Sequence, residues 1–120
     1  MALGVAIGAF GAHALKEYFL QFPKHKEYYQ TAVQYHFVHA LGLFAVAWCH
    51  TKWQSQLIIK AGYCLCFGIF VFSGSLYALS LSQIKVFGAI VPIGGIAFIA
   101  AWILLLIGIV LSKETKSETV

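Results

Sequence analysis

The stretch VFGAIVPIGGIAFIAAWILLLIGIVLS, residues 86–112, contains no charged side chain. A helix needs about 20 apolar residues to cross the ~30 Å hydrocarbon core of a bilayer, so this stretch is long enough to span it. Two further runs, Tyr28–Thr51 and Ala61–Ile84, also lack Asp, Glu, Lys and Arg. Because 61% of the residues are hydrophobic and only 10% are charged, the sequence predicts an integral membrane protein with three spanning helices.

A shorter apolar run, MALGVAIGAFGAHAL, occupies residues 1–15 and ends at Lys16. At ~1.5 Å per residue it rises only ~22 Å, which is less than the thickness of the bilayer. A cleaved signal peptide is the alternative, since Ala12-His13-Ala14 fits a small-x-small cleavage site. The run has no basic segment before it and no leucine-rich centre, so we expect a short or truncated first helix instead.

The expected fold is an all-α membrane protein with four transmembrane helices in an antiparallel up-down bundle. The short link SQIKVFG, residues 82–88, places the last two helices side by side in opposite directions. We expect one domain over residues 1–111, with helices at 1–16, 31–50, 57–81 and 86–111. The aromatic and charged stretch before residue 31 is expected to be an interfacial loop, and residues 112–120 a polar tail.

The net charge of +4 arises from eight lysines and four glutamates. Lysines near helix ends are typical of a membrane surface, and they do not form the basic patch that nucleic-acid binding needs. They divide evenly between the two expected surfaces and so leave the orientation undetermined: Lys16, Lys24, Lys26 and Lys85 against Lys52, Lys60, Lys113 and Lys116. The expected partners are the lipid bilayer and either a second copy or another membrane protein, with no nucleic acid.

Small residues indicate where helices pack closely, because lipid supplies no hydrophobic force between helices. Gly4, Gly8 and Gly11 share one face of the first helix, and His13 continues the opposite line of alanines. This pattern predicts a helix wedged between two neighbours. The full set of expected packing residues is Gly4, Gly8, Gly11, Gly74, Pro92, Gly94 and Gly95.

Polar side chains gather toward one end of the expected bundle. Up-down connectivity brings the end of the first helix, the start of the second, the end of the third and the start of the fourth to one membrane surface. The candidate polar cluster in that half comprises His13, Tyr35, His36, His39, Ser73, Ser75 and Tyr77.

Two interpretations of this cluster remain open. Its hydroxyl and imidazole groups can bond across helices, or they can form a site in which His13 and His39 bind haem, zinc or copper. Small residues leave little room for a porphyrin, and three histidines without a partnered carboxylate are a poor metal set. We therefore expect no metal and no cofactor, and, without a nucleophile motif, no catalytic residue.

Four separated motifs resemble the YgdD-type family of small inner-membrane proteins, a domain-of-unknown-function family with a eukaryotic small transmembrane counterpart. They are GAFGAH at 8–13, Tyr35-x-x-x-His39, FSGSLY at 72–77 and P-x-G-G at 92–95, and the resemblance covers nearly all of residues 1–111. It implies a four-helix protein of the cell inner (plasma) membrane with no established activity. Family members usually carry more apolar residues before the glycines, so we expect the reading frame to begin upstream of Met1.

The leading functional interpretation is a non-enzymatic, multi-pass structural or accessory membrane component. The alternative is a small transporter or ligand-binding module whose His/Tyr/Ser cluster lines a polar cavity. Four-helix exporters of this size depend on an intramembrane carboxylate, which the apolar runs here lack.

Overall fold

The computed structural model describes residues 1–117, and this part of the chain is helical from end to end apart from short turns. Three helical segments are long and apolar enough to cross a membrane, and a shorter apolar helix precedes them. In chain order the elements are α1 (Ala2–His13), α2 (Lys16–Gln21), α3 (Pro23–Trp53), α4 (Gln56–Gly68), a π-helical segment η1 (Ile69–Ser73), α5 (Gly74–Ser82) and α6 (Val86–Ser117).

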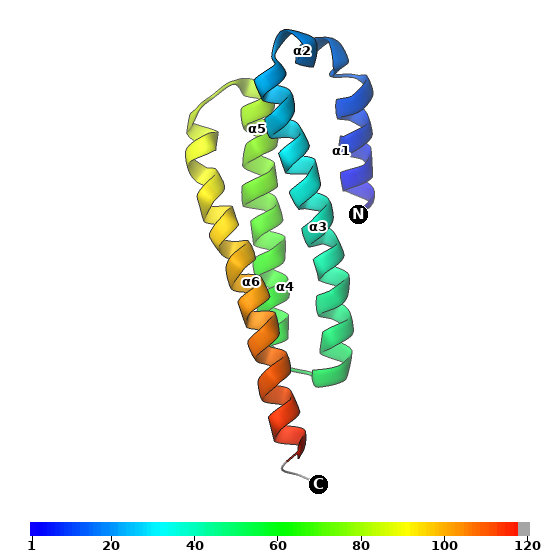
Figure 1. The fold of residues 1–120 in the computed structure, drawn as a ribbon, viewed down its shortest axis with the longest axis vertical. Helices are drawn as coiled ribbons and strands as arrows, with labels where there is room; N and C mark the ends of the chain where they lie inside the picture. The colour runs from blue at the N-terminus through cyan, green and yellow to red at the C-terminus, as the bar shows by residue number, and fades with distance from the viewer. Residues whose placement is uncertain (118–120) are drawn as a thin grey trace.

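The long helices alternate in direction (Figure 1). Helix α3 runs down, α4, η1 and α5 form one rod that runs back up, and α6 runs down again. Tight turns connect them, with Gln54 and Gln83 in the left-handed conformation at φ 44° and 62°. Ser55 then caps α4, its hydroxyl oxygen accepting a hydrogen bond from the Leu57 N–H at 3.3 Å. These short turns keep the three rods antiparallel.

Helix α1 packs along a single long helix, α3, so the expectation of a helix wedged between two is wrong. Its backbone approaches only α2 and α3 among the described elements, and Figure 1 shows it beside the upper half of α3. Gly4 and Gly11 are buried on that side, whereas the alanine line of Ala2, Ala6 and Ala9 is exposed. The reason is geometric: α3 separates α1 from α5 and α6, and no other described helix reaches the outer face of α1.

Two expected boundaries also differ from the structure. The stretch expected to be a loop contains α2 and the first two turns of α3, which begins at Pro23 rather than at residue 31. Proline is favoured at the first position of a helix because its fixed φ suits the helix and its missing N–H costs nothing there. At the other end α6 continues through residues 112–117 of the expected tail, and residues 118–120 lie outside the described part.

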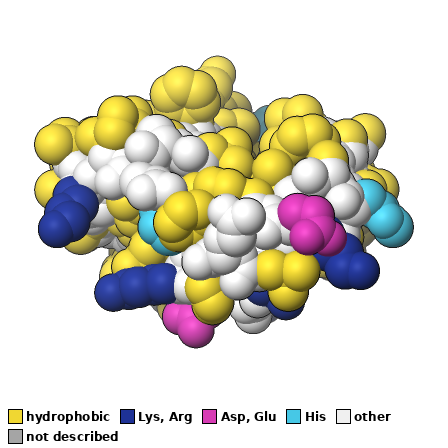
Figure 2. All heavy atoms as spheres, turned by 90° about the horizontal axis from the view of Figure 1, so that it is seen from above, with side chains coloured by type: hydrophobic (Ala, Val, Ile, Leu, Met, Phe, Trp, Pro, Cys, Tyr) yellow, Lys and Arg dark blue, Asp and Glu magenta, His cyan; other side chains and the backbone are white. Residues whose placement is uncertain are grey.

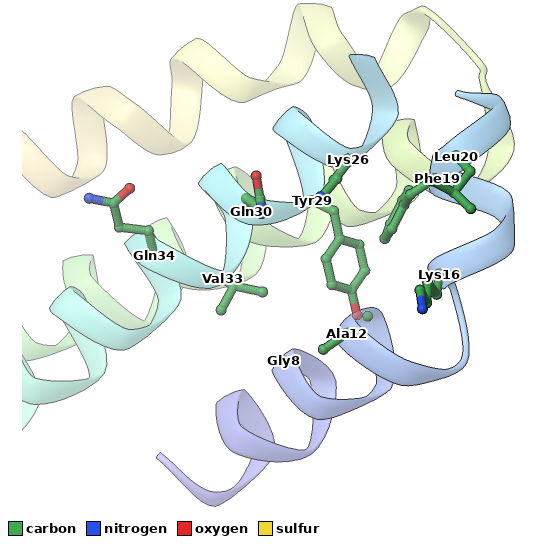
Figure 3. Close-up of a pocket in the computed structure, with 11 residues that line it drawn as sticks. Gly8, Ala12, Lys16, Phe19, Leu20, Lys26, Tyr29, Gln30, Val33 and Gln34 are labelled. Carbon is green, nitrogen blue, oxygen red and sulfur yellow. The ribbon is translucent and has the colours of Figure 1, made fainter. Parts of the chain in front are cut away.

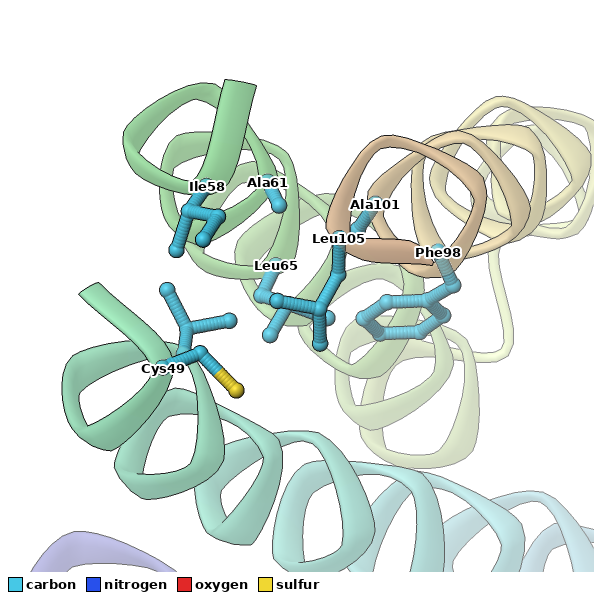
Figure 4. Close-up of a cluster of buried hydrophobic side chains, with 8 residues drawn as sticks. Cys49, Ile58, Ala61, Leu65, Phe98, Ala101 and Leu105 are labelled. Carbon is cyan, nitrogen blue, oxygen red and sulfur yellow. The ribbon is translucent and has the colours of Figure 1, made fainter. Parts of the chain in front are cut away.

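An apolar core fills the lower half of the three-helix layer (Figure 4). It is formed where α3, α4 and α6 meet, and Ile58 and Ala61 of α4 are fully buried in it. Its buried members are Val46, Cys49, Ile58, Ala61, Leu65, Phe98, Ala101 and Leu105.

A close backbone approach joins η1 to α6. In η1 the Gly74 N–H points to the carbonyl of Ile69, five residues earlier, so the helix is locally widened. A Cβ added to Gly94 of α6 would lie 2.7 Å from Phe72 Cβ and 2.8 Å from Phe72 Cα. A Cβ on the next residue, Gly95, would lie an ordinary 3.8 Å from the Phe72 ring. Position 94 therefore admits no side chain unless the two helices move apart.

We expect Gly94→Ala to lower the free energy of unfolding by about 1–3 kcal/mol, because the added methyl group overlaps backbone atoms that cannot rotate away. Gly95→Ala is the matched control and should be neutral or slightly stabilising, since alanine favours helix. Unfolding of the detergent-purified protein by a denaturing detergent measures both. Equal stability of Gly94→Ala and the parent would contradict this packing.

Candidate functional site

A reciprocal pair of hydrogen bonds ties the start of α3 to the end of α5. His25 Nδ1–H donates to the carbonyl oxygen of Ser80 at 2.8 Å, and Ser80 Oγ–H donates to the carbonyl oxygen of His25 at 2.7 Å. Tyr18 of α2 donates to the same Ser80 carbonyl at 2.9 Å. Ser80 is completely buried, so its hydroxyl depends on this internal partner. These three residues form what we call the His25–Ser80 clamp.

Tyr29 joins α1 to the same end of the molecule. Its ring is only 4% exposed, and its hydroxyl donates to the carbonyl oxygen of Ile7 at 2.7 Å. The ring occupies the space beside Gly11, where a Cβ would overlap it, and meets the Tyr77 ring edge-on at 5.2 Å between centroids. Glycine at position 11 is thus required for α1 to lie against α3.

His36 and Tyr77 lie next to this contact. The Tyr77 hydroxyl oxygen is 3.5 Å from His36 Nδ1, at the outer limit of a hydrogen bond. His36 is buried between α1 and α5, with its ring beside Gly4. The pair bridges α3 and α5 below the His25–Ser80 clamp.

His39 belongs to a separate group of stacked rings at mid-height. Its Nδ1–H donates to the carbonyl oxygen of Tyr35, one turn earlier, at 2.8 Å. Its ring lies parallel to Phe98 of α6, with 3.4 Å between centroids, while Tyr35 stacks on Phe72 at 4.4 Å. We call Tyr35, His39, Phe72 and Phe98 the aromatic stack. It connects α3, η1 and α6 through ring faces.

The structure brings some residues of the sequence-predicted cluster together and leaves others apart. His36 pairs with Tyr77, and Tyr35 and His39 share the aromatic stack. Ser73 and Ser75 are buried, and the Ser73 hydroxyl has no hydrogen-bond partner among the described residues. His13 is exposed at the end of α1 and does not join the cluster, because the outer face of α1 is uncovered.

Some of the expected packing residues contact a neighbouring helix closely, and others do not. Gly4 and Gly8 lie at ordinary contact distance from α3, since a Cβ there would be 3.5 Å from Phe37 and 3.6 Å from Val33. Gly11 lies directly against the Tyr29 ring, and Gly94 lies directly against the Phe72 backbone. Gly95 faces the Phe72 ring. Gly74 has no neighbour within 4 Å of an added Cβ, and Pro92 lies exposed inside α6. Neither of these two makes a close helix contact.

Sequence reasoning missed Tyr18, His25 and Tyr29, because they lie in the stretch expected to be a loop. Pro23 was the available signal, since it marks a helix start. A helix beginning there places Tyr29, Ala32, His36 and His39 on one face, and all four are buried. Ser80 lay within an expected helix, but its partner, His25, did not.

An open groove lies between α1, α2 and the upper part of α3 (Figure 3). Its volume is about 640 Å³. None of the seven residues of the sequence-predicted cluster lines it. Its walls are mainly apolar, with Lys16 and Lys26 among the lining side chains. Within residues 1–113, no three His, Cys, Asp or Glu side chains come together in a metal-binding arrangement.

The structure is thus all-helical, with three apolar helices long enough to cross a membrane and a polar network bonded to backbone carbonyls. The family described as "Protein of unknown function (DUF423)" matches residues 7–95. The chain belongs to this family, which confirms the resemblance drawn from the motifs.

Curated relatives agree with this assignment. The chain is 46% identical to the UPF0382 membrane protein YwdK of Bacillus subtilis, over 90% of this chain and 87% of that protein. It is 42% identical to the UPF0382 membrane protein SSP2132 of Staphylococcus saprophyticus, over 88% and 86%. It is 34% identical to the UPF0382 inner membrane protein YgdD of Escherichia coli, over 92% and 82%. No solved structure matches. The expected location in the cell inner (plasma) membrane is confirmed.

We expect Tyr29→Phe to lower the free energy of unfolding by about 0.6–2 kcal/mol, the range for interhelical hydrogen bonds in membranes. The change removes only the hydroxyl that bonds the Ile7 carbonyl and keeps the ring beside Gly11. His13→Ala is the control and should leave stability unchanged, because His13 is exposed. Denaturing-detergent titration measures both. A His13→Ala variant less stable than Tyr29→Phe would contradict the placement of α1.

Proposed function

We propose that the protein is a multi-pass, non-enzymatic structural or accessory component of the membrane. In this proposal α3, the α4–η1–α5 rod and α6 each cross the bilayer, and α1 enters it only part of the way, beside α3. The observation that supports this proposal is that the polar side chains form hydrogen bonds to backbone carbonyls. His25, His39, Tyr18, Tyr29 and Ser80 all donate to backbone carbonyls, so these groups serve to join or brace helices.

The outward surfaces of the rods support a lipid environment. Large hydrophobic side chains stand exposed on every long helix, for example Phe44 at 65%, Phe70 at 81% and Ile96 at 67%. A water-soluble monomer rarely exposes such continuous apolar surface, whereas lipid tails cover it without penalty. The same faces leave room for the partners that we propose besides lipid, namely a second copy or another membrane protein.

The two ends of the rods have the character of membrane surfaces. Figure 2, seen from above, shows lysine and glutamate side chains among hydrophobic ones at the end that carries α2. At the opposite end the Lys113 ammonium lies 5.9 Å from the centre of the Trp53 ring, which joins α6 to α3. Tryptophan and lysine are enriched where helices meet lipid headgroups. Between the two ends, the long helices carry few charges.

Sidedness of single cysteines tests the proposed topology. In a variant without the native cysteines, we expect Glu17→Cys and Lys85→Cys to react with a membrane-impermeant maleimide from one side. Gln56→Cys and Lys113→Cys should react only from the other side, because the rods alternate in direction. Intact cells and inside-out vesicles supply the two sides.

Phe44→Cys is the control within the apolar region, and it should resist the water-soluble reagent from both sides although position 44 is 65% exposed in the protein alone. Labelling of Gln56→Cys and Lys85→Cys from the same side would overturn the multi-pass topology. Ready labelling of Phe44→Cys would overturn the lipid-covered surface.

A further inference from the structure

The groove between α1, α2 and α3 has the two-part character of an amphipathic ligand site. Gly8 and Ala12 of α1 and Val33 of α3 form its apolar length, and Phe19 lines the end of the groove nearest α2 (Figure 3). The volume of about 640 Å³ lies within the ~300–1,000 Å³ typical of small-molecule pockets. Small side chains on α1 keep this channel open, since larger ones would fill it.

Both charged side chains that line the groove are lysines. Lys16 is the first residue of α2 and Lys26 lies in the first turn of α3, so both stand at the end of the rods that carries the other surface charges. Both are exposed. Glu17 and Glu27 follow them in sequence but do not line the groove. The groove therefore offers positive charge near the membrane surface and mainly apolar walls along its length, with the amides of Gln30 and Gln34 on the α3 side.

An anionic phospholipid matches this arrangement. Its phosphate is the group that two ammonium ions at a membrane surface attract, and its acyl chain suits an apolar channel that runs from the surface into the bilayer. A soluble anion would use the lysines but leave the apolar walls in contact with water. A zwitterionic lipid would fill the channel without a net charge to balance the lysines.

We propose that the groove binds one anionic phospholipid, with its phosphate between Lys16 and Lys26 and one acyl chain along Gly8, Ala12 and Val33. This proposal rests on the multi-pass arrangement, which places the groove at the membrane surface. Bound lipid would cover the side of the α1–α3 contact that no described helix covers.

Lipid titration of the full-length detergent-purified protein, followed by native mass spectrometry, tests the proposal. Phosphatidylglycerol and phosphatidylcholine with identical acyl chains serve as the two probes. We expect the first phosphatidylglycerol to bind more tightly than phosphatidylcholine. The double variant Lys16→Gln/Lys26→Gln should weaken phosphatidylglycerol binding about tenfold or more, because each lysine contributes to attraction of the anionic headgroup.

The matched control is Lys24→Gln/Lys85→Gln, which removes the same charge from the same end of the molecule but not from the groove. This control should retain phosphatidylglycerol binding to within about twofold, because neither lysine lines the groove and salt screens exposed charges. Ala12→Leu keeps both lysines and narrows the apolar channel, so it should also weaken binding. Excess inorganic phosphate should not displace the lipid.

Equal binding of the two lipids, or an equal loss in both double variants, would overturn the proposal. Displacement by inorganic phosphate would show a headgroup site alone and overturn the role of the apolar channel. The unfolding temperature of each variant, measured in parallel, identifies a loss of folding. If the cysteine labelling shows the expected sidedness and lipid selectivity is absent, the groove fails as a lipid site while the topology stands.

Discussion

The His25–Ser80 clamp sets the arrangement on which the upper half of the molecule depends. It fixes the start of α3 against the end of α5 through two reciprocal bonds, and Tyr18 adds α2 to the same carbonyl. Each donor would carry a large desolvation cost if it were buried alone in an apolar environment. Only a narrow range of helix positions satisfies all three donors at once. The clamp therefore selects one register between α3 and α5.

The position of α1 follows from that register. With α3 held at its first turns, Tyr29 projects toward α1, where Gly11 leaves space for the ring and the Ile7 carbonyl accepts its hydroxyl. The lower half is held differently, by apolar packing, and the Gly94–Phe72 approach joins η1 to α6 above that core. Specific polar bonds thus fix the upper end, and apolar packing fixes the lower half. The groove lies beside these polar bonds, between α1, α2 and the upper part of α3.

Hydrophobic length made the long helices predictable from sequence. Uncharged runs must lie in lipid or protein, so the three apolar rods, the short first helix and the membrane location could all be anticipated. The glycine face of α1 was also readable, since Gly4, Gly8 and Gly11 do face α3. Helical spacing alone could not show that the opposite face would lack a neighbour. That depends on which helices stand beside each other in three dimensions.

The polar residues were harder to assign for a physical reason. Lysine, glutamate and tyrosine around Pro23 resemble an interfacial loop in composition, yet a helix that extends beyond the apolar core carries the same residues. The sequence placed His36 and Tyr77 in one half of the molecule. The bond of His25 to Ser80 could not be predicted in the same way, because that prediction needs the position at which α3 begins. The widened turn at η1 has no local sequence signal, and it lies where Phe72 approaches Gly94 of a distant helix.

The central claim is that these polar groups act as structural contacts between helices. A double-mutant cycle on His25→Ala and Ser80→Ala tests it most directly, with the free energy of unfolding measured for the parent, both single variants and the double variant. Because the two residues exchange hydrogen bonds, we expect a coupling energy of about 0.5–3 kcal/mol, so that the second substitution costs much less after the first. Additive effects, with no coupling between the two positions, would contradict the clamp and the structural role built on it.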